Sequence, residues 1–339
     1  MSKVKVWLSE LRAPFLTGTI IPIVLGTIIA WVRNSAFNPL FFVLALLGGI
    51  FVHLGANVVN DYFDYKSGND TMNKEFVRPF TGGSRAIPSG LLTPKEVFSG
   101  AVVLFTLSAI VGLYFTIVVG PFMIVLAAVG LFSAYFYTGK PFNLSARGIG
   151  EPIVGLNFGL LMTLGAFYVQ TRGLSVEPLV AAIPVALLIT AILYINAFQD
   201  YTSDKSVGKN TWVVRLGREK ASIVYAGMMY GTYAAIAVAV LFKIIPVYTL
   251  IALATLPLTV KSVSNARQFY STSLQLALSN ALTIVVHLFT GILLMLGYLL
   301  SAFSLLTVGF IAVLSAAAIT IALAFLLFKK IAYGKRPPS

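Results

Sequence analysis

Residues 39–64 read PLFFVLALLGGIFVHLGANVVNDYFD, an apolar run that ends in a cluster of asparagine and aspartate. Apolar runs of roughly 17–25 residues are long enough to cross a lipid bilayer as a helix. A second run, residues 178–200, reads PLVAAIPVALLITAILYINAFQD and ends in the same Asn-x-x-x-Asp spacing. The two stretches predict a pair of membrane helices, each with a polar site where it leaves the membrane.

The composition extends this prediction to the whole chain. Hydrophobic residues make up 58% of the sequence and charged residues 10%, with a mean hydropathy of +0.91. Soluble proteins have about 45–50% apolar and about 25% charged residues. We therefore predict an all-α, polytopic membrane helical bundle of nine core helices and a tenth, near residues 13–31, 39–61, 94–116, 121–137, 150–170, 178–198, 220–241, 246–260, 277–299 and 303–328.

The two Asn-x-x-x-Asp elements end the second and the sixth predicted helices. Elements that recur at such an interval are typical of polytopic proteins with internal repeats. We expect two related halves around a central cavity. One transmembrane domain should cover residues 1–300, and residues 301–339 should add a C-terminal helix and a basic cytoplasmic tail. The absence of cysteine excludes disulfides, thiolate ligands and a cysteine nucleophile.

Basic residues predict the orientation, because Lys and Arg collect in short cytoplasmic loops. With the N-terminus inside, only Arg33, Arg172 and Lys243 of the 24 Lys and Arg residues fall on the outer side. We therefore expect an integral protein of the cell membrane, with its N-terminus and its polar loops in the cytoplasm. The net charge of +13 is explained by this topology and by anionic lipid, so a nucleic-acid partner is not required.

The acidic residues suggest metal chemistry. The chain has 11 Asp and Glu residues, yet several of them crowd the two Asn-x-x-x-Asp elements. Charged groups at a membrane boundary are costly and usually functional. Mg²⁺ takes carboxylate and amide oxygens and often bridges to a substrate phosphate. On two continuous helices these side chains would form facing stripes that hold a diphosphate between two Mg²⁺ ions; the candidate ligands are Asn60, Asp61, Asp64, Asp70, Asn196, Asp200 and Asp204.

Basic and aromatic residues surround these elements on the same side of the membrane. Lys66, Arg85, Lys140 and Lys209 could neutralise phosphate charge, and Tyr137 is one of several nearby aromatic residues. Aromatic faces attract cations. This combination suits the ionisation of an allylic diphosphate, shielding of the carbocation and attack by a second substrate.

Other interpretations of single residues are open. Asp61 and Asp64 could pair with Arg or Lys at the helix end, and Glu151 could stabilise a helix N-terminus instead of acting as a base. His53 lies one turn before Asn57 and is a candidate base, but a single histidine in a helix is more often a packing residue. A transporter could also place paired carboxylates between repeated halves, although near the middle of the membrane.

The stretches Asn60-Asp-Tyr-Phe-Asp64-Tyr-Lys-Ser-Gly-Asn-Asp70 and Asn196-Ala-Phe-Gln-Asp200-Tyr-Thr-Ser-Asp204-Lys-Ser-Val-Gly208-Lys209 closely resemble the two signature motifs of the UbiA superfamily of intramembrane prenyltransferases. The resemblance implies a helical bundle and Mg²⁺-dependent transfer of a polyprenyl group from its diphosphate to a small aromatic acceptor. Members often carry an acidic residue where this chain has Gly68, so the resemblance leaves Asp70, two residues later, as the candidate ligand there, and a contact of Asp61 with the metal through water stays open.

Three further stretches resemble the branch of that family that prenylates 1,4-dihydroxy-2-naphthoate in menaquinone synthesis. They are Thr81-Gly-Gly-Ser-Arg85 followed by Gly90-Leu-Leu-Thr-Pro-Lys-Glu96, Tyr137-Thr-Gly-Lys-Pro141, and Gly148-Ile-Gly-Glu151 leading to Tyr168-Val-Gln-Thr171. The resemblance implies catalytic roles for Asp64, Asp200, Asp204, Arg85 and Lys140. Other acceptors stay open: 4-hydroxybenzoate, homogentisate, haem or geranylgeranylglyceryl phosphate.

Overall fold

The structure is a computed structural model and describes residues 2–303. Within these residues the chain is helical and contains no strand. In this described part of the chain, eight helical segments are long and apolar enough to cross a membrane, and α6 (Phe122–Phe136) is a shorter apolar helix. Six of the eight are single helices, namely α2 (Thr17–Asn34), α3 (Pro39–Ser67), α5 (Pro94–Val118), α9 (Val176–Asn196), α12 (Arg218–Leu241) and α14 (Ser273–Phe303).

The other two long segments are composite. One joins α7 (Gly150–Val154), the π-helical η3 (Gly155–Leu161) and α8 (Met162–Thr171), and the other joins the 3₁₀-helical η4 (Val247–Thr255) and α13 (Leu256–Phe269). The predicted helix over residues 246–260 was therefore too short. Its polar continuation is helical because Ser262 and Ala266 are buried against the bundle. The predicted tenth helix and the basic tail, residues 304–339, lie outside the described residues.

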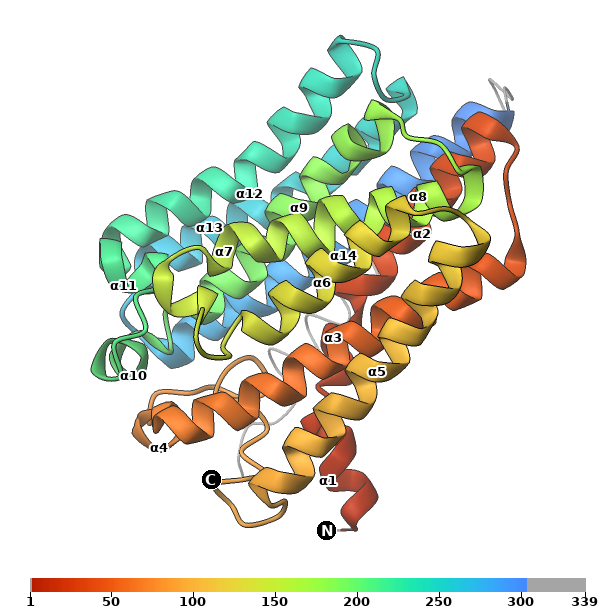
Figure 1. The fold of residues 1–339 in the computed structure, drawn as a ribbon. Coiled ribbons are helices and arrows are strands. Elements are labelled where there is room, and N and C mark those ends of the chain that lie inside the picture. The colour runs from red at the N-terminus through yellow and green to blue at the C-terminus, as the bar shows by residue number, and fades with distance from the viewer. Residues whose placement is uncertain (1, 304–339) are drawn as a thin grey trace.

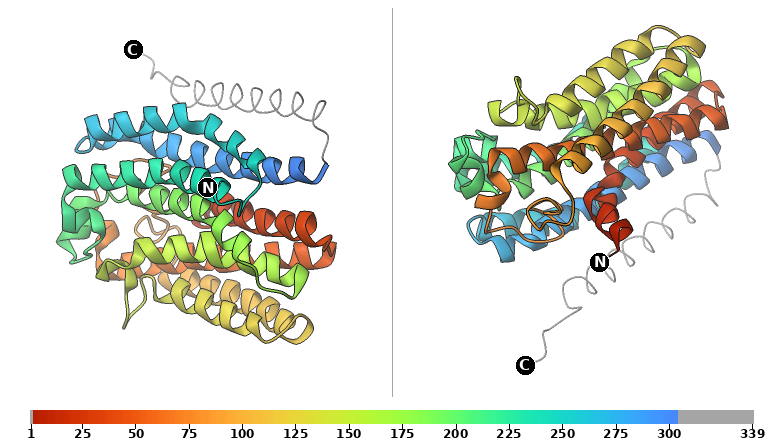
Figure 2. Two further views of the ribbon diagram at one scale, coloured as in Figure 1. Left: turned by 90° about the horizontal axis from the view of Figure 1, so that it is seen from above. Right: turned by 60° about the horizontal axis from the view of Figure 1, so that its bottom comes forward.

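The long helices run side by side, and three short helices gather at one end of the bundle (Figure 1). These are α4 (Asn69–Met72), α10 (Tyr201–Ser206) and α11 (Trp212–Leu216). The two further views place the green α10 and α11 at the same end as the orange loop after α3 (Figure 2). This arrangement agrees with the prediction that the polar loops after the second and the sixth predicted helices lie on one side of the membrane.

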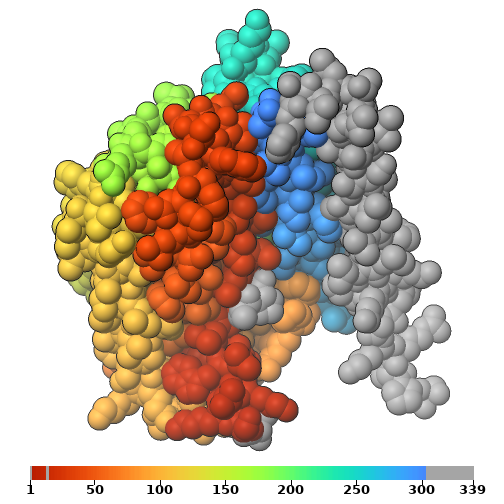
Figure 3. Space-filling model, turned by 90° about the vertical axis from the view of Figure 1, so that its right-hand side faces the viewer, coloured from red at the N-terminus to blue at the C-terminus, as the bar shows by residue number. Residues whose placement is uncertain are grey.

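The N-terminal helix α1 (Lys3–Glu10) also lies at this end, below the long helices (Figure 3). It packs on the start of α5, where a Cβ added to Gly100 would come within 2.6 Å of the Trp7 side chain. Val6 is buried in the same contact. The turn η1 (Ala13–Leu16) then leads into α2. Residues before the first membrane helix thus form part of the polar end.

Close helix contacts explain several glycines in the bundle. A Cβ on Gly159 in η3 would lie 2.5 Å from the Cα of Ala186 in α9. Small residues at such contacts let two helix backbones approach closely in a membrane. The side of η3 that carries Gly155 and Gly159 therefore faces α9, which leaves Asn157 on a different side.

The substitution Gly159→Ala should lower the stability of the fold, because the backbone of α9 cannot move aside easily. We expect a loss of about 1–3 kcal/mol, the usual cost of overpacking. Gly227→Ala in α12 is the matched control, since a Cβ there meets no atom of residues 2–303 within 4 Å. Thermal unfolding in detergent measures both variants. Equal melting temperatures for the two would contradict the predicted contact.

Candidate functional site

The second Asn-x-x-x-Asp element does not lie on one continuous helix. Helix α9 ends at Asn196, and Asp200 precedes the first residue of α10. The predicted stripe of Asn196, Asp200 and Asp204 on one helical face is therefore wrong. The reason is tertiary: the Arg218 Nε donates to the Phe198 carbonyl at 3.0 Å, and Asn280 Nδ2 donates to the Asn196 side-chain oxygen at 2.7 Å.

The first element does lie on a helix, because α3 continues through it to Ser67. Asp61 and Asp64 nevertheless have different surroundings. Asp61 is buried; its carboxylate pairs with Arg12 and accepts a hydrogen bond from the Ser84 N–H at 2.9 Å. This is the helix-end ion pair that the sequence left open. A metal role for Asp61 stays a prediction.

Gly83 permits this contact between the N-terminus, α3 and the following loop. Its φ is +63°, and a Cβ would lie 2.9 Å from both the Arg12 guanidinium and the Asp61 carboxylate. Ser84 also donates a hydrogen bond to Glu10, whose side chain is fully buried. Gly83 therefore has a structural function in this site.

Helix α4 connects the two elements directly. Asn69 Nδ2 donates to Asp204 at 3.1 Å, and Asn73 Nδ2 donates to Asp200 at 2.7 Å. Arg85 fixes this helix by donating to the backbone carbonyl of Asp70 at 2.9 Å. The sequence interpretation missed both asparagines because their partners, Asp204 and Asp200, come from the other half of the chain; their signal was a pair of amides four residues apart after Gly68.

Lys209 lies between carboxylates of the two elements. Its Nζ is 3.7 Å from Asp64 and 3.5 Å from Asp204. Burial by itself would lower the pKa of Lys209, but the charges of Asp204 and Asp64 outweigh it and raise that pKa. The ammonium group thus stays charged and offsets part of the repulsion between the elements.

The surroundings of these carboxylates disfavour their charged form. Burial, followed by the charge of Asp64, raises the pKa of Asp70 to about 7. Burial also raises the pKa of Asp200 and Asp204, and neighbouring carboxylates raise them further. A cluster of this kind favours binding of positive charge, because a bound cation would relieve both effects.

Glu75 ties the loop after α4 to the second half of the chain. It accepts hydrogen bonds from Thr202 at 2.8 Å, from Arg218 at 2.6 Å and from Ser273 at 3.3 Å. Burial would raise the pKa of Glu75, but these hydrogen bonds and the Arg218 charge lower it. The charged carboxylate therefore holds the loop on α10, α12 and α14.

Three further candidates from the sequence, Lys66, Lys140 and Glu151, have different surroundings. Lys66 and Lys140 are exposed, and Lys66 stacks over the Tyr62 ring. The structure does not bring either lysine to the carboxylates through a direct contact. Glu151 is buried and accepts the backbone N–H of Trp212 at 2.7 Å, which supports its structural interpretation.

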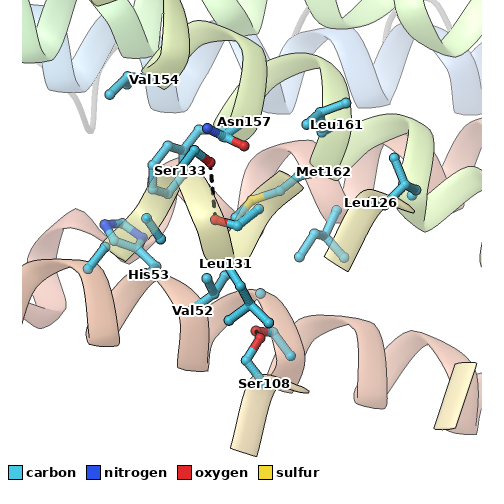
Figure 4. Close-up of a pocket in the computed structure, with 18 of the residues that line it drawn as sticks. Val52, His53, Ser108, Leu126, Leu131, Ser133, Val154, Asn157, Leu161 and Met162 are labelled. Atoms are coloured by element: carbon cyan, nitrogen blue, oxygen red, sulfur yellow. Dashed lines mark hydrogen bonds between the residues drawn. The ribbon is translucent and has the colours of Figure 1, made fainter. Parts of the chain in front are cut away.

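A cavity of about 330 Å³ opens below the polar end and confirms the predicted central cavity. It follows α3 from Ala45 to Asn60, a distance of about 22 Å at 1.5 Å per residue. Its polar end is lined by Arg12, Asn57, Asn60, Tyr137 and Asn196. Figure 4 shows its middle, where apolar side chains such as Leu126, Leu131, Leu161 and Met162 dominate.

The oxygen atoms at the polar end fit a hard divalent cation. The side-chain oxygens of Asn60, Asn69 and Asn73 are buried without a hydrogen-bond partner in the described part of the chain. They lie in or beside the elements that supply Asp64, Asp200 and Asp204. Among residues 2–303 no three His, Cys, Asp or Glu side chains form a metal-binding group by themselves. Carboxylate and amide oxygens together are the donor set that Mg²⁺ prefers.

Two curated proteins are similar over most of this chain. It is 27% identical to 2-carboxy-1,4-naphthoquinone phytyltransferase of Synechocystis sp., covering 87% of this chain and 93% of that protein. It is 30% identical to 1,4-dihydroxy-2-naphthoate octaprenyltransferase of Escherichia coli, covering 77% of this chain and 84% of that protein.

A solved structure shares the fold. A UbiA homolog from Archaeoglobus fulgidus, solved with DMAPP and Mg²⁺, aligns with a TM-score of 0.52 at 16% identity and covers 85% of this chain and 98% of that one. The sequence also matches the pattern of the UbiA prenyltransferase family over residues 19–269. That range begins in α2 and ends with α13, and it contains both elements.

Proposed function

This chain belongs to the UbiA prenyltransferase family, and we propose that it transfers a polyprenyl group from its diphosphate to 1,4-dihydroxy-2-naphthoate. Because the chain belongs to this family, it is an enzyme and not a transporter. The single observation that supports the site is the junction of the two elements, where α4 and Lys209 join Asp64, Asp200 and Asp204. The acceptor is suggested by the similar naphthoate and naphthoquinone prenyltransferases.

We propose that the diphosphate binds at this junction beside Lys209, with Asn60, Asp64, Asp70, Asn196, Asp200 and Asp204 as the candidate ligands of two Mg²⁺ ions. Mg²⁺, when bound, would neutralise the charge of the departing diphosphate. Asn73 and Asn69 orient Asp200 and Asp204 by donating hydrogen bonds to them. Arg85 acts indirectly, since it holds the backbone of α4.

The isoprenoid chain would enter the cavity, whose apolar side chains exclude water from the allylic cation. The acceptor carbon that carries the carboxylate attacks this cation. A C–C bond forms, the C–O bond to diphosphate breaks, and the carboxylate leaves as carbon dioxide with its electrons returned to the ring. By the positive-inside distribution of Lys and Arg, we place the site at the cytoplasmic face of the cell membrane.

Product analysis tests the proposal. Purified protein in lipid receives Mg²⁺, geranylgeranyl diphosphate and, separately, 1,4-dihydroxy-2-naphthoate, 4-hydroxybenzoate or geranylgeranylglyceryl phosphate. We expect a prenylated, decarboxylated naphthoquinol by mass spectrometry, and its loss on addition of a chelator. Transfer only to another acceptor would overturn the naphthoate assignment and keep the prenyltransferase chemistry.

A further inference from the structure

Asn157 is a polar residue in the wall of the mainly apolar middle of the cavity. It belongs to η3, which is π-helical, and single turns of π-helix inside α-helices occur frequently at functional sites. Gly155 and Gly159 press against Thr190 and Ala186 of α9, so the opposite side of this turn faces the cavity. Figure 4 shows the Asn157 amide projecting into it.

Only half of this amide is satisfied within the described chain. The Nδ2 donates to the Ile153 carbonyl at 2.9 Å, whereas the Oδ1 is buried and accepts no hydrogen bond from any described residue. A buried acceptor without a partner costs about 1–3 kcal/mol. Polar side chains inside a membrane are therefore retained where they bind something. This oxygen can pair only with a hydrogen-bond donor.

His53 supplies a second polar group on the same cavity. Its Nδ1 hydrogen-bonds Thr19 at 2.8 Å, and its ring packs edge-on against Phe158 at 4.6 Å between centroids. Both His53 and Asn157 line the cavity. His53 lies seven residues before Asn60 on α3, which corresponds to about 10 Å along the helix axis. That length is comparable with the long axis of a substituted two-ring aromatic molecule.

The chemistry of the two substrates decides what this polar pair can bind. An isoprenoid chain has no hydrogen to donate to an amide oxygen, and a diphosphate anion is repelled by it. A phenolic hydroxyl of the acceptor donates such a hydrogen bond. We propose that Asn157, with His53 beside it, forms the subsite that binds a hydroxyl of the aromatic acceptor. The inference rests on the proposed function, because it assumes a hydroxylated aromatic substrate.

Competitive inhibitors test the subsite without depending on ring reactivity. The probes are 2-naphthoate, 1-hydroxy-2-naphthoate and 4-hydroxy-2-naphthoate, measured against prenylation of 1,4-dihydroxy-2-naphthoate. In the wild type at least one hydroxyl should tighten inhibition about three- to tenfold, the usual effect of one hydrogen bond. Asn157→Leu, which keeps the side-chain size, should abolish that advantage and leave the KM of the diphosphate donor unchanged.

Ser133→Ala is the matched control. Ser133 lines the same cavity, but its hydroxyl already donates to the carbonyls of Val129 at 2.6 Å and Gly130 at 3.1 Å. It should retain the full advantage of the hydroxylated inhibitor. Asn157→Ala serves as a second variant if Asn157→Leu melts at a lower temperature than the wild type.

Each outcome is decisive. No advantage of either hydroxyl in the wild type, or an equal advantage in the Asn157 variants, overturns the subsite and indicates that Asn157 holds water or packs. An equal loss in Ser133→Ala indicates a change of cavity shape and also overturns it. Failure of the wild type to prenylate 1,4-dihydroxy-2-naphthoate would instead show that the proposed function is wrong.

Discussion

Replacement of Asp200 by alanine is expected to lower turnover by about a thousandfold, the order expected when a preorganised electrostatic group is removed from an active site. The Asp200 carboxylate accepts from Asn73 and lies in the same cluster as Asp204 and Lys209. Its loss removes a negative charge that the cluster needs to hold Mg²⁺ and diphosphate. Initial rates with saturating donor and acceptor measure the effect.

A second measurement separates binding from folding. Mg²⁺ together with diphosphate should raise the melting temperature of the wild type, because a ligand that binds only the native state stabilises it. Asp200→Ala should melt normally and lose this shift. Glu219→Ala, an exposed carboxylate at the start of α12, is the control and should behave as the wild type. Activity of Asp200→Ala within threefold of the wild type would sink the proposed metal site.

Replacement of Lys209 by methionine should lower turnover about a hundredfold. The ammonium group lies within 4 Å of Asp64 and Asp204, so its removal leaves two carboxylates facing each other without compensation. It also removes the charge that we propose beside the diphosphate. Methionine keeps most of the side-chain volume, which limits the change to charge and hydrogen bonding.

Lys205→Met is the matched control for this variant. Lys205 is exposed on α10 and stacks over the Tyr201 ring, and among the described residues it forms no ion pair with a carboxylate. We expect it to keep at least half of the wild-type rate. Equal rates for the two lysine variants would show that Lys209 does not act on the diphosphate or on the cluster.

Much of the fold could be predicted because a membrane imposes one simple rule on each segment, namely an apolar run of sufficient length. The positions of Asn60 and Asp64 at the end of α3 followed from that rule. The break after Asn196 did not, because it depends on Arg218 and Asn280, which come from distant helices. Hydropathy contains no information about such hydrogen bonds.

The candidate site could likewise be predicted only in part. Lys209 was recognised from its place in the second motif, whereas Asn69 and Asn73 were missed because their partners come from the other half of the chain. Asp61 could not be distinguished from Asp64 by residue type. The difference between them is Arg12 and Ser84, which the fold brings to Asp61 from either side in sequence.

The hydrogen bonds of Glu75 have a consequence for biogenesis. Its three partners are separated from it by 127, 143 and 198 residues along the chain. During synthesis a ribosome delivers both Asn-x-x-x-Asp elements well before it delivers Ser273. A nascent chain therefore carries every proposed ligand while Glu75 still lacks its Ser273 partner, and the hydrogen bonds that hold this loop are completed only when α14 emerges.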